Sequence, residues 1–309
     1  MKSFAVAAGK GGVGKSTIAV QLALACKRLG QRVALLDADL YGPSIPYLLP
    51  QDEPPKRVGE TLFPAYASGI ATLSLNHFRK DAAVRAPIAN QLITQMFHNV
   101  NWGDPDTFLI DFPPGTGDIH LTICQQIRLN GAVLVTMPNE LALLDVRKSA
   151  AVFQKMGVPI VGVIENMSFL THAPAISPFG TGAGRRLAHE LGVPLWAEVP
   201  LDSDLAQPGF YLPLFDDVAR HLIEEEKEGL KLELKEGQLY LEGDEIDCQK
   251  LQKQCPCALC VQGGAALPNV EVKRMSLVGH YGFRFVFSSG CSNGIYEKEL
   301  LESCVKSVV

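Results

Sequence analysis

Residues 7–20 read AAGKGGVGKSTIAV, and this stretch decides the fold. Gly9 to Ser16 satisfy the pattern G-x-x-x-x-G-K-[ST], in which glycines let backbone N–H groups converge on phosphate oxygens. An apolar run precedes the pattern and an Ala- and Leu-rich segment follows it, as a strand, a phosphate-binding loop and a helix require. The sequence therefore predicts an α/β domain that binds a nucleotide near its N-terminus.

The first 223 residues continue this pattern, because short apolar or β-branched runs alternate with helical segments such as 17–30 and 142–157. The expected strands lie at 3–8, 32–39, 69–75, 107–112, 131–138, 159–166 and 194–200. This alternation is typical of a mostly parallel sheet covered by helices on both faces. We expect residues 1–223 to form a P-loop NTPase domain.

The composition changes after Leu222. Residues 224–236 are rich in charge, and we expect them to form a linker or the start of a second domain. Residues 237–309 contain short strand-like runs and several cysteines, which predict a small β-rich, metal-binding domain. A chain of 309 residues is long enough for one large core and this smaller one.

The charge balance bears on the partners. The chain has 28 Lys and Arg against 33 Asp and Glu, a net charge of −5, and no basic stripe. This disfavours nucleic acid and an anionic membrane as partners. No segment approaches the roughly 20 apolar residues of a membrane span, and we expect a cytoplasmic protein.

The phosphate-binding pattern predicts a role for several single residues. Lys15 reaches the β- and γ-phosphates of ATP, and Ser16 offers its hydroxyl to Mg²⁺. Asp111 ends an apolar strand ahead of a glycine loop, where it is able to hold Mg²⁺ through water. The expected nucleotide-binding residues are Gly11, Gly12, Val13, Gly14, Lys15, Ser16, Thr17 and Asn166.

Five motifs occur together in the first domain: GKGGVGKST (9–17), LLDADLYGPSIP (35–46), DFPPGTGD (111–118), ENMS (165–168) and VPLD (199–202). In this order and spacing they resemble the Mrp family of ATPases, within the group that includes the ParA and MinD proteins. The resemblance covers about residues 1–216. It implies a slow Mg-dependent ATPase that forms a nucleotide-dependent homodimer and carries or assembles iron–sulfur clusters.

The resemblance also implies roles for single residues. Lys10 is implied to reach across the dimer and neutralise phosphate charge in the partner's site; an ordinary solvated lysine is the alternative. Asp39 is implied to position the attacking water and Asn166 to read the adenine edge, although Asn166 also suits a plain turn. Asp37, at a strand end, either helps to order the Mg²⁺ shell or serves as a turn or cap residue.

The sequence departs from the family pattern after ENMS. Mrp-type carriers usually place a Cys-x-x-Cys pair there, which bridges a cluster between two subunits. No cysteine occurs between Cys124 and Cys248 in this chain, so the bridging pair is missing. His172 falls near the first lost cysteine, and we expect it to be a loop histidine because one imidazole is a poor substitute for two thiolates.

The C-terminal cysteines offer another metal site. Cys255, Cys257 and Cys260, with the later stretch VGHYGFRFVFSSGCSNGIY (278–296), resemble a small domain found at the N-terminus of γ-butyrobetaine hydroxylases. There three cysteines and a histidine are implied to hold zinc; here Cys291 takes the matching position. Four thiolates suit zinc or an iron–sulfur cluster, and four small buried side chains are the alternative. We expect His280 to lie on a strand surface.

Three functions remain open. The first is an ATP-hydrolysing carrier or assembly factor for iron–sulfur clusters, with apo iron–sulfur proteins or an assembly scaffold as partners. The second is a positioning switch like the ParA and MinD proteins. The third is a nucleotide-controlled binding module in which a structural zinc domain docks partners.

Overall fold

The computed structural model describes residues 1–39, 42–74, 93–97, 99–115, 117–224, 232–235, 237–241, 243–255, 270–278, 282–292, 294–296 and 298–306. The chain forms two compact units, Met1–Glu225 and Glu226–Val309. Three residues that the sequence singles out, Cys257, Cys260 and His280, lie outside the described residues.

The first unit is built on an eight-stranded sheet with the order β10-β9-β8-β1-β7-β2-β6-β5. Its strands are β1 (Lys2–Ala8), β2 (Val33–Asp37), β5 (Ala65–Ala67), β6 (Ile70–Ser74), β7 (Thr107–Asp111), β8 (Gly131–Thr136), β9 (Ile160–Glu165) and β10 (Leu195–Glu198). Neighbouring strands run parallel, except that β5 is antiparallel to β6. The prediction of a mostly parallel sheet is confirmed.

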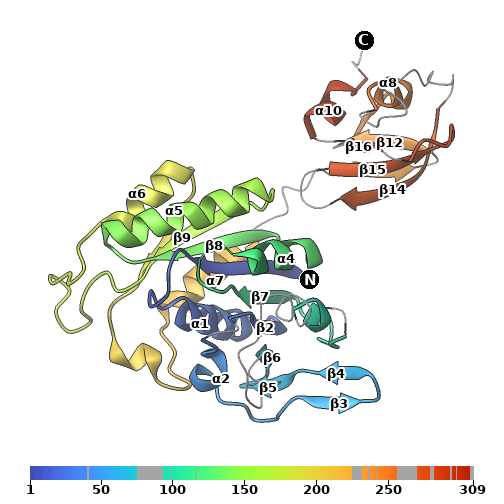
Figure 1. Cartoon of the computed structure of the whole chain (residues 1–309). Coiled ribbons are helices and arrows are strands. Elements are labelled where there is room, and N and C mark those ends of the chain that lie inside the picture. Colours follow the sequence, from blue (N-terminus) through green and yellow to red (C-terminus); the bar gives the residue numbers. More distant parts are fainter. Residues whose placement is uncertain are drawn as a thin grey trace. The chain divides into compact units, whose positions relative to one another are not determined.

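Helices cover both faces of this sheet, as Figure 1 shows for α5 and α6 on one side and α1 on the other. The helices α1 (Lys15–Arg28) and α7 (Leu214–Glu224) share one core with the sheet. The other core includes side chains from α4 (Asp118–Gln126), α5 (Glu140–Lys155) and α6 (Ala183–Leu191). Strand β1 serves both cores, since Phe4 and Val6 face the first and Ala5 and Ala7 the second.

Four short elements complete the first unit: α2 (Ile45–Leu48), β3 (Lys56–Val58), β4 (Thr61–Phe63) and the 3-10 helix η2 (Ser203–Ala206). Strands β3 and β4 form an antiparallel hairpin outside the main sheet. Among the helices of the described residues, none combines the length and apolar character needed to cross a membrane.

Local sequence explains the bounds of α1. Gly14 precedes the helix with a φ of 82°, a left-handed conformation that a glycine adopts without steric cost. Lys27 and Arg28 lie in the last turn, where their charge is favourable at the negative end of the helix dipole. Gly30 follows with a φ of 85°, as expected for a residue that ends a helix. The helix therefore begins directly at the phosphate loop.

The second unit is small and β-rich. It contains two three-stranded sheets, with the orders β11-β12-β13 and β14-β15-β16. Its elements are β11 (Leu232–Lys235), β12 (Gln238–Leu241), β13 (Asp244–Glu245), α8 (Cys248–Lys253), β14 (Val272–Val278), β15 (Gly282–Phe287), β16 (Ile295–Tyr296) and α10 (Lys298–Ser303). Phe285, Phe287 and Tyr296 are fully buried in its core, where their rings pack against one another at tilted or edge-on angles. Strand β11 lies within the charged stretch 224–236.

Candidate functional site

The phosphate loop joins the end of β1 to the start of α1. Gly11 and Gly12 are exposed, whereas Val13 is buried beneath the loop. A Cβ atom on Gly9 would collide with the backbone of α5 at Asp145 and Val146, so this position needs glycine for close packing. The loop is thus fixed against a helix from elsewhere in the chain, with its exposed glycines free to face a ligand.

Two carboxylates lie beside this loop because their strands end at the same edge of the sheet. Asp37 on β2 and Asp111 on β7 are register partners, and β7 also pairs with β1. The Lys15 ammonium forms an ion pair and a hydrogen bond with Asp111, and it lies 3.4 Å from the hydroxyl oxygen of Ser16. Carboxyl edges of parallel strands are where open α/β sheets bind ligands.

The charges at this edge are unbalanced. Asp37 and Asp111 are inaccessible to solvent and Asp39 is only 9% exposed, and Lys15 forms its ion pair with Asp111. Burial, with the nearby Asp111 charge, raises the pKa of Asp37 to about 7. Burial also raises the pKa of Asp111, against the opposing effect of Lys15. A further positive charge would therefore stabilise the ionised carboxylates at this edge of the sheet.

A divalent cation fits this edge of the sheet. The Asp111 Oδ2 atom is buried without a hydrogen-bond partner in the described structure, as expected for an oxygen that awaits a ligand. Oxygen ligands are those that Mg²⁺ prefers, and Mg²⁺ keeps several waters and substrate phosphates in its shell. No three His, Cys, Asp or Glu side chains converge on one point in the described ranges, so the protein alone does not form a closed cage.

Asp37 and Asp39 also shape the loop after β2. Asp37 accepts hydrogen bonds from the backbone N–H of Asp39 at 3.1 Å, from that of Ile45 at 3.3 Å and from the Ser74 hydroxyl at 3.2 Å. Asp39 accepts one from the N–H of Gly42 at 3.1 Å. Asp37 therefore organises the backbone of this loop, as the turn or cap alternative requires. Its place in the Mg²⁺ shell stays a prediction.

Asn166 lies directly over the phosphate loop. Its amide nitrogen donates a hydrogen bond of 2.8 Å to the carbonyl oxygen of Val13, and a Cβ atom on Gly14 would collide with that amide. The Oδ1 atom of Asn166 is buried and has no hydrogen-bond partner in the described structure. An acceptor of this kind suits the amino group of an adenine base.

Lys10 contrasts with Lys15. It is half-buried, and within the described part of the chain it forms neither a hydrogen bond nor an ion pair. Exposed apolar side chains occur nearby on the first turns of α5, at Leu141 and Leu144, whose helix contacts the loop at Gly9. The surface around the loop is therefore partly apolar and carries an uncommitted cation.

Two residues that were not predicted as site residues make further contacts around the site. The Ser149 hydroxyl, in the middle of α5, donates to the Ala8 carbonyl oxygen at 3.2 Å and lies 3.3 Å from that of Gly115. Glu165 is buried and accepts hydrogen bonds from the backbone N–H of Gly184 at 2.5 Å and from the Ser168 hydroxyl at 3.1 Å. A carboxylate at a strand end in the ENMS motif was the signal for Glu165; Ser149 had none.

In the second unit, two of the four predicted metal ligands come together. The Sγ atoms of Cys255 and Cys291 lie 3.7 Å apart, and Cys255 is 3% exposed. A Cβ atom on Gly294 would lie 2.7 Å from the Cys255 Sγ, so a larger residue there would press on this thiol. His172, by contrast, is an exposed loop residue of the first unit.

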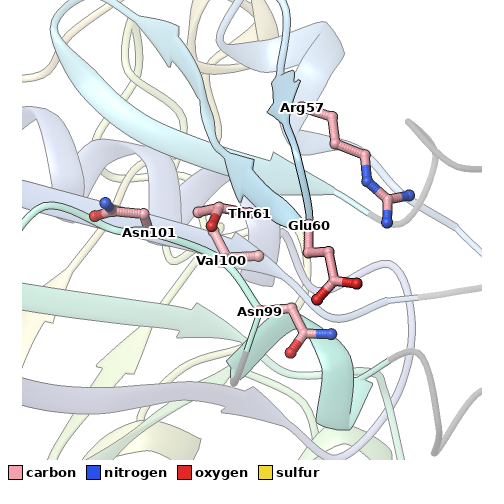
Figure 2. Close-up of a pocket in the computed structure, with 6 residues that line it drawn as sticks. All are labelled: Arg57, Glu60, Thr61, Asn99, Val100 and Asn101. Carbon is pink, nitrogen blue, oxygen red and sulfur yellow. The ribbon is translucent and has the colours of Figure 1, made fainter.

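A separate cavity of about 550 Å³ lies beside the β3–β4 hairpin (Figure 2). It is lined by Arg57, Glu60, Thr61, Asn99, Val100 and Asn101. Backbone hydrogen bonds from Leu62 to Asn99 and from Asn101 to Leu62 hold its walls together. All its polar side chains are exposed, so it offers no buried group that would orient a ligand.

Comparison with known proteins finds matches for both units. Residues 1–210 match the family model described as NUBPL iron-transfer P-loop NTPase, and residues 222–302 match that of the N-terminal region of γ-butyrobetaine hydroxylase-like proteins. The iron-sulfur cluster carrier protein of Synechocystis sp. is 42% identical over 219 residues, which cover 66% of this chain and 62% of that protein. The chain thus spans less than two thirds of the length of this curated relative.

Solved structures show the same fold. A nucleotide-binding protein from Archaeoglobus fulgidus, in complex with ADP, is 33% identical with a TM-score of 0.53, covering 73% of this chain and 89% of that one. The cell division ATPase MinD of Pyrococcus furiosus, at 22% identity and a TM-score of 0.54, covers 72% and 98% and supports the fold alone. Because the family model matches more than half of the sequence, the chain belongs to the NUBPL iron-transfer P-loop NTPase family.

Proposed function

We propose that this protein is an ATP-dependent carrier or assembly factor for iron–sulfur clusters that acts as a nucleotide-dependent homodimer and hydrolyses ATP slowly. The observation that carries the proposal is the buried, charge-deficient edge at Asp37 and Asp111, placed directly beside a phosphate loop. The relatives named iron-sulfur cluster carrier proteins support the cargo.

ATP binding would redistribute the charges of this edge. Lys15 would move from Asp111 toward the β- and γ-phosphates. Asp111 is a buried carboxylate whose second oxygen has no partner in the described structure, so it would then be available to the metal ion. Asp111, Asp37 and the Ser16 hydroxyl would then hold Mg²⁺, which supplies the charge that this edge lacks. Gly11 to Gly14 and Thr17 would contact the phosphates, and Asn166 the base.

Lys10 is proposed to act across the dimer. A half-buried lysine without a partner among the described residues is free to neutralise phosphate charge in a second copy, as an arginine finger does. Apolar residues on the helix that contacts the loop offer surface for that contact: Leu141 and Leu144 of α5 are 69% and 52% exposed. The Asp39 charge lies near enough to raise the pKa of Asp111, and Asp39 is proposed to position the attacking water.

The C-terminal cysteines are proposed to form one metal site from Cys255, Cys257, Cys260 and Cys291. Zinc–sulfur bonds of about 2.3 Å in a tetrahedron place neighbouring sulfurs about 3.8 Å apart. The 3.7 Å between the Sγ atoms of Cys255 and Cys291 suits two thiolates on one metal ion. A cubane cluster takes one cysteine on each iron and separates the thiolates further, so the distance favours zinc or a two-iron cluster.

This distance supports a second function, a nucleotide-controlled module with a structural zinc domain. The sequence lacks cysteine between Cys124 and Cys248, where the Mrp resemblance implies a bridging pair, and a small domain gains stability from a metal. Metal, labile sulfide and the visible spectrum of protein purified without oxygen separate the two functions. Iron with sulfide that passes to an apo iron–sulfur protein supports the carrier; stoichiometric zinc without sulfide supports the docking module.

The dimer proposal is tested with Lys10→Ala beside Lys15→Ala. Lys15→Ala is expected to abolish ATP binding, because the phosphates lose their main side-chain cation. Lys10→Ala is expected to bind ATP but to lose hydrolysis and ATP-dependent dimerisation, measured by light scattering after size exclusion. Equal loss of affinity in both variants, with Lys10→Ala still forming dimers, would contradict the division of labour.

A further inference from the structure

His120 is a buried polar residue that the proposed reaction does not use. It lies in the first turn of α4, directly after the loop that follows Asp111, and its side chain is 1% exposed. Within the part of the chain that the structure describes, neither of its ring nitrogens has a hydrogen-bond partner. The adjacent carbonyl oxygen, that of Gly117, accepts from the backbone N–H of His120 at 3.0 Å instead.

The surroundings of the ring are aromatic. Its centroid lies 5.3 Å from that of Phe112 and 6.3 Å from that of Phe153. Burial lowers the pKa of His120 to about 4; the Gly117 backbone opposes this shift, and the Lys15 charge acts in the same direction as burial. The imidazole is therefore neutral at physiological pH, and neither its N–H donor nor its acceptor nitrogen has a hydrogen-bond partner in the described structure. A phenylalanine would fill this space without leaving polar atoms unpaired.

The position of His120 links it to the nucleotide. Phe112, which packs on the imidazole, directly follows Asp111, and Asp111 is the partner of Lys15. A nucleotide that draws Lys15 toward its phosphates removes the partner that fixes this carboxylate. Without that partner Asp111 can shift, and with it Phe112, whose ring packs on the imidazole. The backbone that follows offers further donors and acceptors.

We propose that His120 is a positioning residue, whose ring nitrogens gain hydrogen-bond partners among residues 112–115 or Gly117 when bound nucleotide separates Lys15 from Asp111. The unpaired imidazole destabilises the nucleotide-free arrangement, and pairing stabilises the bound one. A group that stabilises one state more than the other shifts the equilibrium between them. The residue thus strengthens nucleotide binding without touching the nucleotide. This inference rests on the proposed ATP site.

The test compares His120→Phe, which removes both polar atoms, with His120→Gln, which retains a donor and an acceptor. His120→Phe is expected to unfold at a temperature equal to or above that of the unchanged protein without nucleotide, but to bind ATP about ten-fold more weakly, the equivalent of one lost hydrogen bond. His120→Gln is expected to recover most of the affinity. Cys124→Ala, one turn along the same helix, controls for disturbance of α4 and should leave ATP affinity unchanged.

Two results would overturn this role. One is His120→Phe that binds ATP as tightly as the unchanged protein. The other is that, without nucleotide, the His120→Phe variant unfolds at a lower temperature than the unchanged protein or fails to fold. The imidazole would then stabilise the nucleotide-free state, contrary to the proposal. An unchanged protein that does not bind ATP at all would instead refute the proposed function, so the two failures are distinguishable by isothermal titration of the variants and the parent.

Discussion

Replacing Lys15 with methionine tests the electrostatics of the site without any nucleotide. Methionine keeps an unbranched chain but removes the cation that pairs with Asp111, and the two side chains are only 7% and 0% exposed. Removing one partner of a buried ion pair costs about 3–5 kcal/mol, because the remaining charge is left without compensation. We expect Lys15→Met to lose this much free energy of unfolding at pH 8.

The loss should shrink in acid. Burial already raises the pKa of Asp111, and the loss of Lys15 raises it further, so the folded variant binds a proton more tightly than the unfolded chain. Stability then increases as the pH falls from 8 toward the unfolded value near 4, by at most about 1.4 kcal/mol per pH unit for each proton. Between pH 8 and pH 5.5 most of the deficit is therefore recovered.

Urea unfolding followed by tryptophan fluorescence measures this effect in the right part of the chain. The two tryptophans, Trp102 and Trp196, both lie in the first unit. The double variant Lys15→Met/Asp111→Asn, which leaves no charge at the pair, should regain most of the lost stability at pH 8. The reasoning is refuted if Lys15→Met loses the same free energy at both pH values, or if the double variant is as unstable as the single one.

Three further substitutions test other contacts. Asp39→Ala is expected to trap an ATP-bound dimer that hydrolyses slowly, because no carboxylate positions the water; turnover at the unchanged rate in a phosphate-release assay would remove that role. Gly14→Ala should lower both ATP affinity and the unfolding temperature, since its φ is 82° and the new methyl group meets an amide; Gly59→Ala, with a φ of 61° and no neighbour within 4 Å, reports the backbone strain alone. Glu165→Gln should lower the unfolding free energy by about 1–3 kcal/mol, whereas the exposed Glu190→Gln should change it by less than about 1 kcal/mol in the same urea titration.

Seven strands of the main sheet, all except β5, could be predicted from the sequence because most are short, largely buried runs that end in a turn. All five residues of β2 and of β7 are buried, for example, so no polar position interrupts the pattern. The β3–β4 hairpin was not predicted, since its six residues are exposed or half-buried and carry no alternation. Helix α4 begins at a glycine loop without a capping side chain, which removes the usual start signal.

The site also contains residues that the sequence predicts and residues that only the structure reveals. Lys15, Asp37 and Asp111 were predictable because each belongs to a motif at the end of a strand, and parallel strands bring such ends together. Ser149 reaches the site from the middle of a helix, so only the packing of α5 against β1 reveals it. That the ring nitrogens of His120 have no hydrogen-bond partner in the described structure is likewise a property of the folded environment, which no local sequence pattern encodes.

The proximity of Cys255 and Cys291 has a consequence for handling the protein in air. Their sulfur atoms lie 3.7 Å apart, and a disulfide needs them at about 2.05 Å, so a small movement suffices once dioxygen is present to accept the two electrons and two protons. Protein isolated aerobically without its metal would then hold a bond in place of two ligands. An intact mass lower by two hydrogens, restored by a reductant, would identify preparations whose missing metal reflects oxidation instead of the native state.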